Sequence, residues 1–92
     1  MICFCFKVYE IFVANGKTES ILESYIRQRG DIKRKLDRLK SNPRKECGSH
    51  PLHGSLAGKW SCWLGGNIRA VYRIDDERRL IIIEAVGTHK IY

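Results

Sequence analysis

Three short strand-like segments, joined by tight turns, fill the C-terminal half of the chain and constrain its fold most. They cover residues 59–64, 68–75 and 79–86. The first two alternate apolar and polar residues, which is typical of strands that bury one face, and the run Leu80-Ile81-Ile82-Ile83 in the third predicts a central buried strand. Gly65-Gly66-Asn67 separates the first segment from the second, and an acidic turn at 75–78 separates the second from the third. The sequence therefore predicts a three-stranded antiparallel meander.

The N-terminal half is predicted to supply one strand and a helical hairpin. Residues 3–13 are nearly all apolar, aromatic or β-branched, which favours a strand covered on both faces. Thr18 or Ser20 is expected to cap a first helix and Asp31 a second one, which ends at Asn42-Pro43. Residues 44–56 carry several glycines and serines and are predicted to be a loop. The expected fold class is α+β, with the helices packed on one face of the sheet.

Length and composition indicate a globular protein. The 92 residues are expected to form a single domain, 1–92, and 43% of them are hydrophobic. No apolar run reaches the ~18–20 residues of a membrane span, and the first residues do not resemble a secretory signal, so a cytoplasmic location without membrane contact is expected. The four cysteines match neither a zinc motif nor a disulfide framework. Ordinary thiols are expected, with no metal and no cofactor.

The net charge of +7 is concentrated in one segment. Residues 27–47 carry nine bases against three acids, a surplus of six. Three interpretations remain open at this point. The segment is a solvated helix face, a surface that binds a polyanion such as nucleic acid, or a docking face for an acidic protein.

One face of the predicted meander combines cations with an aromatic ring. Alternation places Trp63, Arg69 and Arg73 together, which suits nucleotide binding by charge and by stacking. Arg69 has a structural alternative, in which it ties the meander to a helix. All three histidines, His50, His53 and His89, lie at the two ends of the stretch 50–92.

The order of these pieces resembles the RelE/ParE superfamily of toxins, over about residues 6–92. The matching pieces are Asn42-Pro43, His50-Pro51-Leu52, the segment 68–75, and Gly87-Thr88-His89. The two histidine motifs are most similar to YafQ-like and RelE-like mRNA interferases. The resemblance implies a RelE-like fold with an N-terminal strand, a two-helix hairpin, and a C-terminal meander of three to four strands.

The resemblance also implies a function. The chain is expected to be the toxin of a type II toxin–antitoxin system, an endoribonuclease that enters the ribosomal A site and cuts mRNA. In this chemistry the neighbouring 2′-hydroxyl attacks the phosphate while one group removes its proton and another protonates the departing 5′-oxygen. The implied partners are a cognate antitoxin, mRNA and the ribosome. The oligomeric state is left open.

Residue by residue, the resemblance assigns His50 and His89 to proton transfer and Tyr92 to the C-terminal catalytic aromatic position. His53 is an additional candidate for proton transfer. The expected RNA-binding side chains are those of Lys45, Lys59, Trp63, Arg69 and Arg73.

Two positions depart from the family pattern. Trp63 stands where YafQ-like members carry a histidine, and Asn67 where they carry an aspartate. Two further functions are therefore kept: a ParE-like toxin that acts on a DNA topoisomerase without cutting RNA, and a catalytically silent protein that binds an antitoxin.

Overall fold

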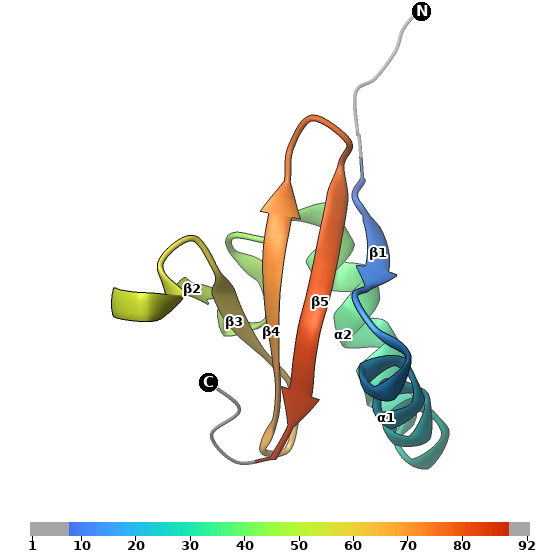
Figure 1. The fold of residues 1–92 in the computed structure, drawn as a ribbon. Coiled ribbons are helices and arrows are strands. Elements are labelled where there is room, and N and C mark those ends of the chain that lie inside the picture. The colour runs from blue at the N-terminus through green and yellow to red at the C-terminus, as the bar shows by residue number, and fades with distance from the viewer. Residues whose placement is uncertain (1–7, 89–92) are drawn as a thin grey trace, which may run out of the picture.

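A computed structural model describes residues 8–88 and shows one five-stranded sheet with two helices (Figure 1). The elements in chain order are β1 (Glu10–Val13), α1 (Gly16–Gln28), α2 (Gly30–Ser41), β2 (His50–Pro51), β3 (Trp60–Gly65), β4 (Ile68–Asp75) and β5 (Leu80–Gly87). Two 3-10 turns, η1 (Glu46–Gly48) and η2 (Gly54–Leu56), flank β2. This architecture confirms the predicted α+β fold class.

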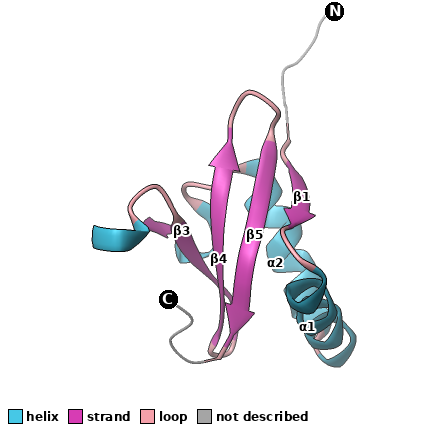
Figure 2. Cartoon of the chain, viewed as in Figure 1, coloured by secondary structure: helices cyan, strands magenta, loops and turns pink. Residues whose placement is uncertain are grey.

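The strand order in the sheet is β1-β5-β4-β3-β2. Strands β2 to β5 pair antiparallel, so the predicted meander is confirmed, and β1 pairs parallel to β5. Figure 2 shows both helices on the same side of this sheet, with α2 passing behind the strands. Helix α1 packs against β5 and β1, and α2 packs against β3. The helices therefore cover one face of the sheet, and no helix covers the other face within residues 8–88.

The core lies between the helices and the covered face. Its fully buried members come from both helical and strand segments: Tyr72, Ile32, Leu39, Leu64, Ile81, Ile83 and Cys62. Strand β4 buries Ile68, Ala70 and Tyr72 as expected, but Val71, predicted on the opposite face, is buried too. The Tyr72 hydroxyl donates to the Pro43 carbonyl at 2.6 Å and lies 2.7 Å from the Ser49 hydroxyl. These contacts fasten the segment after α2 to the sheet.

Three predictions about local structure were wrong. In the described part of the first strand only one face is covered, since Phe12 is 56% exposed. Helix α1 is capped by Asn15, whose side chain accepts a hydrogen bond from the Thr18 backbone amide, and not by Thr18 or Ser20. Asp31 lies inside α2, whose N-cap is Arg29.

The predicted loop 44–56 also contains regular structure, namely β2 and the two 3-10 turns. Long-range contacts such as that of Ser49 with Tyr72 hold this segment, and local sequence patterns do not show such contacts. Within residues 8–88, neither helix is long and apolar enough to cross a membrane.

Candidate active site on the outer face of the sheet

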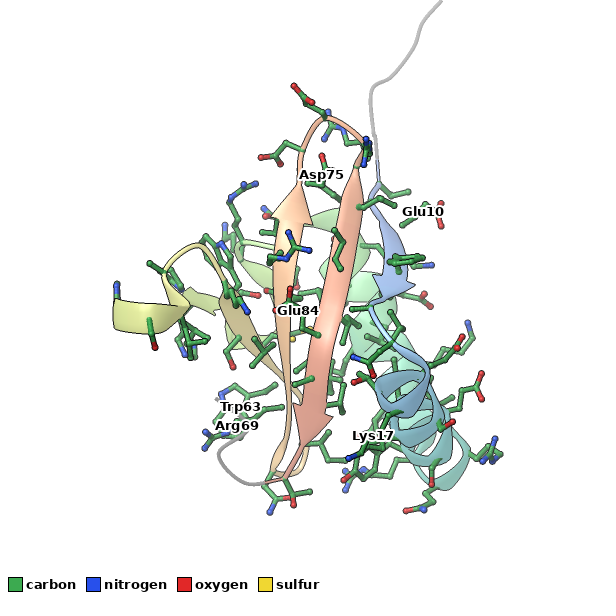
Figure 3. All side chains as sticks on the ribbon, viewed as in Figure 1. Glu10, Lys17, Trp63, Arg69, Asp75 and Glu84 are labelled. Atoms are coloured by element: carbon green, nitrogen blue, oxygen red, sulfur yellow. The ribbon has the colours of Figure 1, made fainter. Side chains whose placement is uncertain are left out.

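The outer face is the side of the sheet turned away from α1 and α2. Its side chains alternate with the core residues along each strand. The β3–β4 register places Trp63 directly opposite Arg69, and the β2–β3 register places His50 opposite Ser61. Figure 3 shows Trp63 and Arg69 side by side at one end of β4, with Asp75 at the other end. The sheet therefore brings Trp63 and Arg69 together, as the sequence predicted, and places His50 on the neighbouring strand β2.

Trp63 and Arg69 form a cation–π pair. The guanidinium carbon of Arg69 lies 4.3 Å from the centroid of the Trp63 ring, within the range in which such pairs attract. Gly48 of η1 supports the ring, because a Cβ at position 48 would stand 3.1 Å from its Cδ1 atom. The buried Nε of Arg69 has no hydrogen-bond partner in the part of the chain that the structure describes. The structure thus presents a stacked arginine with unused donor capacity.

Arg69 lies on the outer face and does not tie the meander to a helix. That role belongs to Arg29 and Asp31, at the junction of α1 and α2. The Gly65-Gly66 turn lies against their side chains, and a Cβ on Gly65 would stand 2.8 Å from an Asp31 carboxylate oxygen. The structural alternative for Arg69 is therefore wrong.

Two other predicted phosphate-binding cations share one carboxylate. The Lys59 ammonium lies 2.7 Å from one Glu84 oxygen, and Nε of Arg73 donates to the other at 2.5 Å. Burial alone would raise the pKa of Glu84, but these two partners outweigh it and lower that pKa below its ordinary value. Glu84 is therefore ionised at neutral pH, and the cluster of three side chains carries a net charge of only +1.

Sequence analysis missed Glu84, although a signal for it exists. Glu84 is the extra residue of a β-bulge, since Ile83 pairs with Tyr72 and Ala85 with Val71. A bulge redirects the side chain of its extra residue. The backbone carbonyl of Glu84 accepts a hydrogen bond from the buried Thr18 hydroxyl at 3.2 Å. The available clue was that Glu84 is the one acidic residue in the predicted strand 79–86, which lies next to the strand that carries Arg73.

The histidines are only partly described. His50 is exposed on β2, and its Nδ1 lies 3.2 Å from the carbonyl oxygen of Gly48, the residue that also supports Trp63. His53 is exposed at the start of η2, and Lys45 at the start of η1. His89 and Tyr92 lie outside the described residues, so their predicted meeting with His50 stays a prediction. The last described strand ends at Gly87, which pairs with Arg69.

The two described cysteines belong to the core. The Cys47 thiol donates to the carbonyl of Lys35 at 3.2 Å. Burial, assisted by the nearby Cys47, raises the pKa of Cys62 to about 12, so this thiol stays protonated. No group of three metal-ligating side chains occurs among residues 8–88.

A second surface feature lies on the helical side. An apolar groove of about 330 Å³ runs between α1, α2 and β1. Its floor is apolar and is lined by Ile11, Val13, Leu22, Ile26 and Leu36. The acids Glu19 and Glu23 of α1 form one rim, and Lys33, Lys40 and Asp37 of α2 form the other.

Solved structures share this architecture. The RelBE2 toxin–antitoxin complex of Mycobacterium tuberculosis contains a chain that superposes with a TM-score of 0.72, over 90% of this chain and 100% of that one, at 24% identity. The chain has the RelE toxin fold. A YoeB/ParE toxin from Agrobacterium tumefaciens has the same RelE fold, with a TM-score of 0.69, 21% identity, and coverage of 88% and 99% of the two chains.

YafQ from E. coli also matches, with a TM-score of 0.58, 20% identity, and coverage of 88% and 93%. No family model matches the chain, and no curated protein matches it in sequence. These likenesses confirm the RelE/ParE resemblance at the level of the fold.

Proposed function

We propose that this chain is the toxin of a toxin–antitoxin pair and cuts mRNA during translation in the cytoplasm. The observation that carries the proposal is the Trp63–Arg69 pair on the outer face, with His50 on the strand β2 that borders β3. A stacked arginine that forms no ion pair within residues 8–88 supplies donors for a phosphate, and an exposed imidazole supplies proton transfer near neutral pH. The RelE fold of the chain agrees with this activity.

In the proposed reaction, the ribose 2′-oxygen attacks the adjacent phosphorus and loses its proton to a histidine. The bond from phosphorus to the 5′-oxygen breaks, a second acid protonates that oxygen, and a 2′,3′-cyclic phosphate remains. His50 is one of the two proton-transfer groups, and His89 or His53 is the other. Arg69 stabilises the extra negative charge on the phosphate oxygens. Tyr92, Lys45 and the cations beside Glu84 are further RNA contacts.

The experiment is a translating extract that makes the protein, followed by mapping of new mRNA 5′ ends. We expect codon-positioned cuts, which His50→Ala and Arg69→Gln reduce by roughly 100-fold or more, as losses of a proton-transfer group or charge stabiliser do. Arg78→Gln is the control, because Arg78 lies in the exposed β4–β5 turn. Undiminished cutting by both site variants would refute the site assignment, and no cutting by the wild type would refute the nuclease function.

The Glu84 cluster favours a second candidate. With Lys59 and Arg73 engaged by Glu84, less positive charge remains for RNA, which suits a ParE-like toxin that does not cut RNA. Growth arrest with DNA damage and intact mRNA would select this alternative. Growth that continues unchanged, with antitoxin binding retained, would select a silent binding protein.

The proposed partner is an antitoxin, as in the RelBE2 and YoeB–YefM complexes. The apolar groove offers the antitoxin a site. Apolar side chains of the antitoxin would fill the floor, while its basic and acidic side chains would pair with Glu19 on one rim and Lys33 on the other. Ile26→Glu places a charge on the floor and is expected to weaken the purified complex. Glu77→Gln, in the distant β4–β5 turn, is the control.

A further inference from the structure

Helix α2 presents two charged flanks on either side of its buried stripe. At 3.6 residues per turn, Lys33 and Lys40 fall on the flank toward α1, where they line the apolar groove. Arg34, Lys35 and Arg38 fall on the opposite flank, toward η1 and β3, and we name these three residues the basic flank. The basic segment of the sequence is therefore divided between two separate surfaces.

The basic flank is not neutralised. Within residues 8–88, none of its three side chains lies within ion-pairing distance of a carboxylate. The acid that lines the same depression, Asp31, accepts from Arg29 at 3.2 and 3.3 Å. The flank and Asp31 line a shallow depression of about 240 Å³. Three positive charges thus face solvent around a hollow.

The chemistry of this depression selects among partners. Only charged side chains line it, so a protein partner would find no apolar centre of the kind that protein interfaces bury. Single-stranded bases would find no aromatic ring to stack on. The backbone of a duplex needs only cations, and Arg34 and Arg38 lie roughly 6 Å apart along the helix axis.

We propose that the basic flank binds the phosphate backbone of double-stranded RNA. The inference extends the proposed function to a second surface but does not depend on cleavage. Turn η1 connects the two surfaces, since its Cys47 thiol binds the Lys35 carbonyl and its Gly48 contacts Trp63. A structured RNA on the basic flank would therefore lie next to a single strand on the outer face.

The test compares two triple variants of equal charge. Arg34→Gln, Lys35→Gln and Arg38→Gln remove the basic flank. Lys17→Gln, Arg27→Gln and Arg78→Gln remove three exposed bases from α1 and the β4–β5 turn. Binding of a fluorescent RNA duplex of mixed sequence is followed by anisotropy over a series of KCl concentrations. Urea midpoints show that both variants are folded.

We expect the basic-flank variant to bind the duplex roughly tenfold or more weakly, and its log–log salt slope to become shallower by about 2 to 3, as for three lost phosphate contacts. The control should change the slope by less than about 1. Equal losses in both variants would overturn the inference, because only total charge would matter. Duplex binding that survives while binding of a polyglutamate peptide is lost would overturn it in favour of an acidic protein.

A chain that binds the duplex through the basic flank but cuts no mRNA would refute the proposed nuclease and support this inference. Conversely, if the wild type cuts mRNA and the basic-flank variant binds the duplex as tightly as the wild type, the nuclease is supported and this inference is refuted. The two proposals therefore fail in distinguishable ways.

Discussion

Glu84 sets the charge of the outer face. Trp63 and Arg69 were predictable as neighbours because alternation and a short turn fix the register of two consecutive strands. The ion pairs of Glu84 were not predictable in this way, since they depend on a bulge in β5 and on the side chain of Lys59, the residue before β3. Residue types and spacing therefore indicated which cations share the face but not which of them are already neutralised.

Replacing Glu84 by glutamine should release Lys59 and Arg73 toward solvent. We expect tighter binding of single-stranded RNA and a log–log salt slope steeper by about 1, because up to two more cations contact phosphates at about 0.7 each. Anisotropy titrations in KCl measure both quantities. Glu77→Gln makes the same charge change in an exposed turn and should leave the slope nearly unchanged. Identical slopes for the two variants would contradict this role of Glu84.

Among the elements, strands were predicted better than helix ends and the loop. Strand β4 begins and ends where the alternation does, because one buried face and two flanking turns define it locally. Helix α1 starts earlier than predicted because Asn15, assigned to a turn, also caps the helix. Strand β2 has only two residues and no periodicity to detect, so a loop was the natural prediction there.

The β3–β4 turn depends on glycine for two reasons. Gly65 has a φ of +119°, and its missing side chain leaves room for Asp31. Gly65→Ala should therefore lower the free energy of unfolding by about 1 to 3 kcal/mol. Gly30→Ala is the matched control: no atom lies within 4 Å of its Cβ position, so stability should rise by up to about 1 kcal/mol. Urea unfolding measures the stability of both variants. Equal stability of the two variants would refute the close packing of the Asp31 side chain against Gly65.

At the scale of the whole molecule, one carboxylate joins three distant segments. Asp76 of the β4–β5 turn accepts from the Tyr9 hydroxyl at 2.6 Å and from both terminal nitrogens of Arg44 at 3.0 and 2.8 Å. These bonds connect the residue before β1, the segment after α2, and the turn. The Arg44 bonds, followed by the Tyr9 bond, lower the pKa of Asp76 from 3.8 to about 2.

This pKa predicts a pH dependence. The carboxylate has a lower pKa in the folded chain than in the unfolded chain, so its contribution to stability is fully present above about pH 4. The contribution is lost as the pH falls through about 2. Between about pH 4 and pH 2, the urea midpoint of Asp76→Asn should therefore fall less steeply with pH than that of the wild type. The Glu77→Gln variant should keep the wild-type pH dependence. Parallel profiles for Asp76→Asn and the wild type would contradict the assignment.

The parallel pairing of β1 with β5 has a consequence for how the chain folds. Glu10 pairs with Leu80 and Val13 with Ile83, so the first described strand finds its only partner in the last one. Contacts between such distant segments slow folding, because a long loop must close before they form. During synthesis, β1 can therefore join the sheet only after β5 has left the ribosome. Under the proposed function, a chain built in this way would stay harmless to the ribosome that makes it until β5 is free.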